Sequence, residues 1–316
     1  MFLSMNARLA IACLALPVVG FASIASADTI TVCLDGSCDF IDPAAASAVA
    51  TDGDVIEIAA GTYLLDNPVV IYGPEVQIRG AVDGKGRPAT ILDGQGANQV
   101  LAILLQVDRT ARVENIVITN GFADSGGGLF IRASNVFFEN CVITGNHAGS
   151  LGGGMFLNGH ATPTFTGCEI SGNTVGNPKW ENSGYGAAGW ISEGTVTLVD
   201  SEVSGNSANA VGGGFGMNSE GEVVLDGSRI CGNDAGQASD QNFGAGTVTI
   251  ITGCVEESCD CLPVSPADLN QNGVVNGADL GFMLAAWGSC ADCPADLTGD
   301  GVVNGADLGL LLAAWG

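Results

Sequence analysis

Two segments at the C-terminal end of the chain place oxygen-bearing side chains at a spacing that could hold a metal ion. They are ADLNQNGVVNGADLGFMLAAWG (267–288) and ADLTGDGVVNGADLGLLLAAWG (295–316), which agree at 17 of 22 positions. In each, side-chain oxygens stand at loop positions 1, 3, 5 and 12, and a backbone carbonyl stands at position 7. The candidate ligands are Asp268, Asn270, Asn272, Val274 and Asp279 in the first copy and Asp296, Thr298, Asp300, Val302 and Asp307 in the second. Because hard oxygen ligands at this spacing wrap Ca²⁺, the sequence predicts two calcium sites.

The duplicated loop, followed each time by an apolar stretch, resembles the paired calcium-binding segments of type I dockerins. The resemblance implies a small α-helical, EF-hand-like domain over residues 266–316 that attaches the chain to a cohesin-like protein partner. The exit helices are expected to start near Asp279 and Asp307 and to bury Leu280, Leu284, Leu308 and Leu312. At loop positions 10 and 11, where many dockerins carry partner-reading polar side chains, both copies here carry Gly-Ala. An attachment role is the expectation that survives this departure.

A second set of residues could perform acid–base chemistry on a polysaccharide. Glu169, Glu202 and Arg229 occupy one outward column of an internal repeat, one residue per coil. Adjacent coils lie roughly 4.8 Å apart, which is close to the carboxyl spacing of about 5 Å in retaining glycosidases. The alternative is a solvated face on which Glu202 and Arg229 form an ion pair, and the lack of a clear general acid favours it.

A third set could bind a glycan. One coil is about six residues longer than its neighbours and contains NPKWENSGY (177–185), followed soon by Trp190. Loops on a regular scaffold often carry binding residues, and aromatic faces stack on sugar rings. Trp180, Tyr185 and Trp190 are therefore candidate ligand-binding residues, although Trp180 could instead fold back to cover a coil edge.

The repeat that positions these residues has the periodicity of β-strands. ENIVITNGFA (114–123), ENCVITGNHA (139–148), GCEISGNTV (167–175), DSEVSGNSA (200–208) and GSRICGNDA (227–235) align column by column. The two expected inward columns are Ile118, Ile143, Ile170, Val203 and Ile230, and Ile116, Cys141, Cys168, Ser201 and Ser228. The column Gly121, Asn146, Asn173, Asn206 and Asn233 predicts turns in which asparagine adopts the left-handed conformation and bonds the same amide one coil away.

Short strands in such repeats bury their apolar face only by stacking, which predicts an all-β parallel β-helix over residues 28–252. Residues 39–50 are expected to form a short helix that covers the first coil. The opening DGSCDFIDPAAASAVATDGDVIEIAAGTY (35–63) resembles secreted right-handed β-helix proteins of the pectate-lyase-like group. The segments GGGLF and GGGMF resemble polymorphic outer-membrane protein repeats. The resemblance implies a right-handed solenoid and leaves two functions open, a non-catalytic binding module and a polysaccharide lyase or glycoside hydrolase.

The N-terminal residues 1–27 are typical of a signal peptide. Arg8 precedes an apolar stretch, residues 9–21, and residues 25–27 (Ala-Ser-Ala) form a cleavage site. Export would leave ten of the 11 cysteines, which favours disulfides, with Cys33 and Cys38 close enough to pair. A zinc site made of Cys259, Cys261, Cys290 and Cys293, at and after a 253–265 linker, is the alternative. We expect a secreted, extracellular or cell-surface protein with no transmembrane segment in the mature chain.

The strongly negative charge of the chain limits the classes of partner that it can bind. It has 34 acidic residues against 9 basic ones. A phosphate backbone would be repelled, so nucleic acid is excluded as a partner. Calcium, a polysaccharide or a cell-surface component, and a cohesin-like protein remain as the expected partners.

The two calcium loops should differ in affinity. Copy two offers the carboxylates Asp296, Asp300 and Asp307, whereas copy one offers only Asp268 and Asp279. Affinity in such loops rises with ligand charge, so copy two should fill first. Calorimetric titration of residues 266–316 checks this, with Asp296→Ala and Asp268→Ala as single-site controls. Loss of the tighter site in Asp268→Ala would contradict the charge argument.

Overall fold

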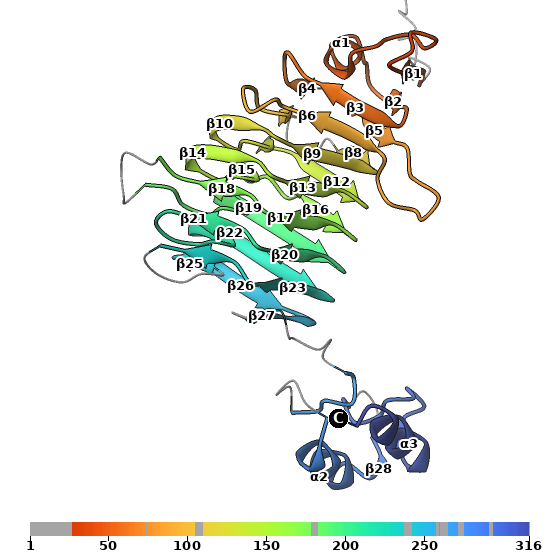
Figure 1. Ribbon diagram of the computed structural model, residues 1–316. Coiled ribbons are helices and arrows are strands. Elements are labelled where there is room, and N and C mark those ends of the chain that lie inside the picture. Colours follow the sequence, from red (N-terminus) through yellow and green to blue (C-terminus); the bar gives the residue numbers. More distant parts are fainter. Residues whose placement is uncertain are drawn as a thin grey trace, which may run out of the picture.

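The computed structural model describes residues 27–73, 75–104, 110–177, 183–236, 242–256, 259, 265–270, 275–290 and 293–315. All but the last residue of the expected signal peptide therefore lies outside the described residues. The rest forms a long stack of parallel strands and a small C-terminal unit of two helices (Figure 1).

The stack is a parallel β-helix whose coils each pass through two faces, a corner and a third face. Face 1 consists of β1 (Thr29–Val32), β2 (Val55–Ile58), β5 (Gln77–Gly80), β8 (Thr110–Glu114), β12 (Asn135–Glu139), β16 (Thr164–Thr166) and β26 (Thr247–Ile250). Face 2 consists of β3 (Gly61–Leu64), β6 (Thr90–Asp93), β9 (Ile116–Thr119), β13 (Val142–Thr144), β17 (Glu169–Ser171), β20 (Glu202–Ser204), β23 (Ser228–Cys231) and β27 (Gly253–Glu256). The eight strands of face 2 correspond to eight coils among the described residues.

The corner and face 3 complete each coil. The corner consists of β10 (Phe122–Ser125), β14 (His147–Leu151), β18 (Thr174–Val175), β21 (Ser207–Ala208) and β24 (Asp234–Ala235). Face 3 consists of β4 (Val69–Tyr72), β7 (Leu101–Leu104), β11 (Leu129–Arg132), β15 (Met155–Asn158) and β25 (Asn242–Gly244). The long strands β19 (Gly189–Val199) and β22 (Phe215–Asp226) run from face 3 into face 1 and join the two into one sheet.

The inward columns expected from the repeat are confirmed. Ile118, Ile143, Ile170, Val203 and Ile230 are fully buried in one continuous core, and the column that contains Cys141 and Ser201 is buried beside them. Each strand pairs in parallel with its equivalent in the next coil, as in Ile143 with Ile170. Stacking thus buries faces that no single coil could cover.

The asparagine column is also confirmed as a buried ladder. The side-chain amide of Asn146 donates to the side-chain oxygen of Asn173 at 2.9 Å, Asn173 donates to Asn206 at 2.9 Å, and Asn206 donates to Asn233 at 2.8 Å. The same oxygens accept the backbone N–H of the preceding coil. The expectation that asparagine adopts the left-handed conformation is wrong, because that conformation belongs to the preceding glycine, as in Gly145 at φ 65° and Gly172 at φ 62°. The asparagine itself points inward to satisfy the backbone.

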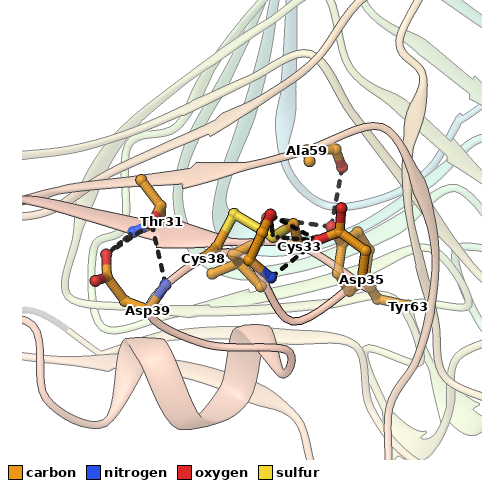
Figure 2. Close-up of a disulfide and its surroundings, with 9 residues drawn as sticks. Thr31, Cys33, Asp35, Cys38, Asp39, Ala59 and Tyr63 are labelled. Carbon is orange, nitrogen blue, oxygen red and sulfur yellow. Dashed lines mark hydrogen bonds between the residues drawn. A yellow bond between two sulfur atoms is a disulfide. The ribbon is translucent and has the colours of Figure 1, made fainter.

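The N-terminal coil is closed by a helix and a disulfide, both as expected. Helix α1 (Pro43–Ser47) starts at Asp42, whose side chain accepts the N–H of Ala44, and it places Ala46 in the core. Figure 2 shows the Cys33–Cys38 disulfide between the Thr31–Asp39 contact and Tyr63. The Thr31 hydroxyl donates to Asp39 at 2.6 Å, and the buried Tyr63 hydroxyl donates to the carbonyl of Ala59 at 3.1 Å. These contacts fix the chain that crosses the open end.

The C-terminal end of the stack corrects two expectations. The coils continue through β27, so the β-helix extends past residue 252. Cys231 bonds Cys259, and Cys290 bonds Cys293. Three of the four cysteines of the alternative zinc site, Cys259, Cys290 and Cys293, are therefore in disulfides, so that alternative is wrong.

The small C-terminal unit contains α2 (Gly277–Ala285), β28 (Gly288–Ser289), β29 (Val302–Val303) and α3 (Gly305–Ala313). Its core is built around the fully buried Met283 and Leu311, one from each helix. Leu280 and Leu308 pack against this core as expected. Leu284 and Leu312 do not, being 54% and 52% exposed. The reason is the rotation of each helix. The buried Asp279 and Asp307 in the first turns lie on the same helix face as the residues four positions later, Met283 and Leu311, so the next residues, Leu284 and Leu312, face outward.

We expect Asn206→Ala to destabilise the β-helix by about 2–3 kcal/mol. The change leaves the buried N–H of Asn173 and carbonyl of Ile170 without their partner, and each loss has a desolvation cost. Chemical denaturation measures the change, with Asn135→Ala on the exposed surface as the matched control. Equal stabilities of the two variants would contradict a structural role for the ladder.

Candidate functional site

The acidic candidates lie side by side on the outer surface of face 2. Glu169 on β17 is in register with Glu202 on β20, which is in register with Arg229 on β23. Arg229 Nε donates to Glu202 at 2.9 Å, and the Ser204 hydroxyl donates to Glu202 at 2.8 Å. Glu169 accepts a hydrogen bond from Ser171 at 2.5 Å. The ion pair between Glu202 and Arg229, which the sequence analysis gave as the alternative, is therefore formed, and it engages the carboxylate of Glu202.

These side chains line a groove of about 530 Å³ that runs along several coils. The loop between β5 and β6 forms one wall with Arg87 and Pro88, and turn residues such as Asp200 form another. The loop is held in place because the Asn140 amide donates to the carbonyl of Gly86 at 3.0 Å. The groove thus has fixed walls and carries both signs of charge.

The aromatic candidates lie beside face 3. Trp180 is outside the described residues. Tyr185 meets the edge of Trp190, with ring centroids 5.8 Å apart. The indole of Trp190 covers Gly216 in the next coil so closely that a Cβ there would lie 2.5 Å from the ring. Trp190 is therefore partly a packing residue, and Gly216 is the position that accommodates it.

Trp190 also belongs to an aromatic column that the sequence reasoning missed. Phe130, Phe156 and Trp190 are in register on the outer surface of β11, β15 and β19, and each is half-buried. The rings of Phe130 and Phe156 stack at 5.5 Å. The sequence carried a signal for two of the three rings, because a phenylalanine follows Gly-Gly-Gly-Leu and Gly-Gly-Gly-Met, whereas Trp190 follows Gly-Ala-Ala-Gly.

A polar column runs parallel to this aromatic column two residues further along the same strands. Arg132 is in register with Asn158, and after a bulge in β19 and β22 the Asn218 amide donates to the Ser192 hydroxyl at 3.4 Å. Among the described residues, the side-chain oxygen of Asn158 is the buried side-chain polar atom that lacks a hydrogen-bond partner. Face 3 therefore presents an apolar strip next to hydrogen-bonding groups over consecutive coils.

The second C-terminal loop brings three of its candidate ligands together, because the Thr298 hydroxyl lies 3.2 Å from an oxygen of Asp296 and 3.0 Å from one of Asp307. Both oxygens of Asp296 accept backbone N–H groups, from Gly299 at 2.9 Å and Gly301 at 2.6 Å. Asp307 accepts the N–H of Thr298 at 3.0 Å and that of Asn304 at 2.7 Å. The hydrogen bond from Asn304 is the main cause that lowers the pKa of Asp307 and keeps it ionised. Asp300 and Val302 stay on the exposed rim of the loop.

The first loop repeats this arrangement where it is described. Asp279 accepts the N–H of Asn270 at 3.1 Å and that of Asn276 at 2.8 Å. Asp268 is buried. Two further candidate ligands, Asn272 and Val274, lie outside the described residues.

The donor set of both loops fits a divalent cation. Asp279 and Asp307 are fully buried, and Asp268 is 4% exposed. No lysine, arginine or histidine occurs anywhere in the sequence after Arg229. Backbone N–H groups already hold the carboxylates of Asp279 and Asp307 in the ionised form, but no basic residue in this part of the chain provides a balancing positive charge. Calcium, held by the residues named above, would supply it.

A family model described as "Right handed beta helix region" matches residues 87–260. Two solved structures of the pectin methylesterase from Aspergillus niger are similar at 13% identity. The form with an N-acetylglucosamine stub covers 72% of this chain and 85% of that chain with a TM-score of 0.37, and the deglycosylated form covers 73% and 85% with a TM-score of 0.33. No curated protein matches the sequence. Among the described helices, none has the length and apolar character needed to cross a membrane.

The ion pair on face 2 predicts a pH dependence. Burial raises the pKa of Glu202, but hydrogen bonds from Arg229 and Ser204 outweigh this and lower it overall. A carboxyl whose pKa is lower when folded contributes stability above its unfolded pKa of about 4.3, and that stability is lost as the pH falls through the folded pKa. Carbon-detected NMR titration should show the Glu202 midpoint rising in Arg229→Met. Arg79→Met, which breaks the ion pairs with Glu57 and Glu114 on face 1, should leave that midpoint unchanged.

Proposed function

Since the chain belongs to the family of proteins with a right-handed β-helix region, we propose that it is a secreted β-helix protein that binds a polysaccharide or another cell-surface component. The ligand lies on face 3, and the calcium-binding C-terminal unit attaches the protein to its partner. The domain division follows from this: a signal peptide over residues 1–27, the β-helix, a short linker and the dockerin-like unit over residues 266–316.

The observation that carries this proposal is the aromatic column beside the polar column on face 3. Phe130, Phe156 and Trp190 recur at the spacing of the coils and are half-buried, so their exposed parts form a continuous apolar strip. Tyr185 extends the strip at its edge. A sugar chain presents apolar C–H faces and hydroxyl groups side by side, and it can contact the rings while bonding the exposed Arg132 and the partly exposed Ser192 and Asn218. Trp180, in the same long coil as Tyr185, is proposed as a further contact.

Binding is favoured over catalysis by the state of the acidic groups. Catalysis at a glycosidic bond needs one carboxyl that carries a proton at working pH and one that does not. Arg229 holds Glu202 in the ionised form. This makes Glu202 a poor general acid.

The attachment role rests on the small C-terminal unit. Three buried aspartates in a segment without basic residues support calcium as the ion that completes its fold. Its helices leave Phe282, Leu284 and Trp287, and the equivalent Leu310, Leu312 and Trp315, between 46% and 58% exposed. Large apolar side chains exposed at equivalent positions of both copies favour a protein partner, which we propose to be cohesin-like.

A second candidate function is a polysaccharide lyase or glycoside hydrolase that acts in the groove of face 2. One observation favours it: Glu169 and Glu202 stand one coil apart in a groove that also contains Arg87 and Arg229. Here Glu169 would act as the acid and Glu202 as the charged group.

A panel of neutral and acidic polysaccharides separates the two functions. Affinity electrophoresis measures binding, and reducing-end and unsaturated-product assays measure cleavage. We expect a bound polysaccharide to retard the protein without any release of product. Phe156→Ala and Trp190→Ala should each bind at least tenfold more weakly, since the aromatic rings contribute most of the apolar contact area. Product release that disappears in Glu169→Gln would instead establish the second function.

The matched control is Phe122→Ala. Phe122 is 45% exposed and stacks on His147 at the corner, away from face 3. This variant should bind like the parent protein. Trp190→Phe keeps a ring over Gly216, so it separates a loss of binding contacts from a loss of packing. Equal weakening by Phe122→Ala would contradict a site on face 3.

A further inference from the structure

Two cysteines lie together in the middle of the β-helix core. Cys141 precedes β13 and Cys168 precedes β17, and they are 0% and 3% exposed. Both are free thiols, whereas Cys33, Cys38, Cys231, Cys254, Cys259, Cys290 and Cys293 are in disulfides. Among the described cysteines, these two are the exception.

The register places the two residues opposite one another in adjacent coils. On one side Glu139 pairs with Thr166, and on the other Val142 pairs with Glu169, so both pairs are offset by 27 residues. Cys141 and Cys168 share this offset. The backbone N–H of Cys141 donates to the sulfur of Cys168 at 3.4 Å. In-register neighbours in adjacent strands are about 4.8 Å apart, which lies within the Cα–Cα range of about 4.4–6.8 Å that a disulfide accepts.

The same column continues in the next two coils with serine. The Ser201 hydroxyl accepts the N–H of Cys168 at 3.0 Å and donates to the carbonyl of Val199 at 2.8 Å. The Ser228 hydroxyl accepts the N–H of Ser201 at 2.9 Å. Serine thus satisfies the backbone of this column with short hydrogen bonds.

The thiols of Cys141 and Cys168 make only long hydrogen bonds to the backbone. Cys141 donates to the carbonyls of Glu139 and Val113 at 3.4 and 3.5 Å, and Cys168 donates to those of Thr166 and Phe138 at 3.4 and 3.6 Å. A thiol is a weak donor, so little is lost when its hydrogen is removed. Hydrogen bonding therefore gives no reason for cysteine at these two positions.

The chain already contains a covalent link between successive coils. Cys231 bonds Cys259, 28 residues later, with Cα atoms 5.0 Å apart. The separation of Cys141 and Cys168 differs from this by one residue. A second link of the same kind is compatible with the stack.

We propose that Cys141 and Cys168 form a disulfide that joins two successive coils in the middle of the β-helix. A thiolate of one cysteine attacks an oxidised small thiol such as glutathione disulfide, and one glutathione leaves. The second cysteine then attacks the mixed disulfide and releases the other glutathione. Two protons and two electrons pass to the oxidant. Because both thiols are buried in the folded protein, the reaction takes place on the folding chain, before the coils close.

Oxidative refolding of the full mature chain tests this. The protein is refolded with reduced and oxidised glutathione, alkylated in denaturant without reductant, and digested for mass spectrometry. We expect a linked peptide pair containing Cys141 and Cys168, two hydrogens lighter than the separate peptides. Alkylated Cys141 and Cys168 in the denatured, unreduced protein would overturn the proposal.

Serine variants provide an independent measurement. Cys141→Ser and Cys168→Ser introduce the residue that the column already uses. Each should lower the melting temperature of the oxidised protein by about 5–10 °C, because a loop of 27 residues is no longer closed in the unfolded chain. The double variant should lower it no further, since both changes break one bond. In dithiothreitol, the double variant should melt no lower than the parent, because serine makes the shorter hydrogen bonds. Additive losses in the two single variants would contradict a shared bond.

Discussion

The in-register stacking of one coil on the next is the constraint on which the whole β-helix depends. Every buried backbone group must find its partner one coil away, because the interior offers no water. The ladder from Asn146 to Asn233 is an example. The side-chain oxygen of an asparagine accepts a backbone N–H of the coil before it, and the side-chain amide donates to a backbone carbonyl of that coil. A coil that slipped by one residue would break the ladder and turn its inward column to the solvent.

The same register organises the outer surface. An outward residue necessarily stands next to its equivalent in the neighbouring coil, so chemical groups accumulate in columns. On face 2 the column brings Glu202 to Arg229, and the charges cancel. On face 3 it brings Phe130 to Phe156 and Trp190, and the rings form a strip. A linear polymer that runs along the axis meets such a column at every coil, which makes a solenoid suited to binding extended ligands.

The C-terminal unit is stabilised in another way. Its two short helices bury few large side chains, chiefly Met283 and Leu311. In the place of apolar residues it buries Asp279 and Asp307, whose oxygens accept the backbone N–H groups at both ends of each loop. If a cation completes this unit, as we propose, its folding and its proposed attachment role depend on the same ion.

The sequence by itself determined the strands, the inward columns, the asparagine ladder, the covering helix and the Cys33–Cys38 pair, because these follow from local periodicity and from a repeat visible in one dimension. It also determined which residues of the two candidate metal-binding loops carry oxygen. It also placed Cys141 and Cys168 in one inward column, but it did not reveal the aromatic column on face 3, nor that Leu284 and Leu312 point outward. Those features depend on the rotation of a helix or on which outward residue of one coil meets which residue of the next. Only the tertiary structure decided them, since the path of the long coil that brings Trp190 beside Phe156 and the rotation of each C-terminal helix depend on three-dimensional packing.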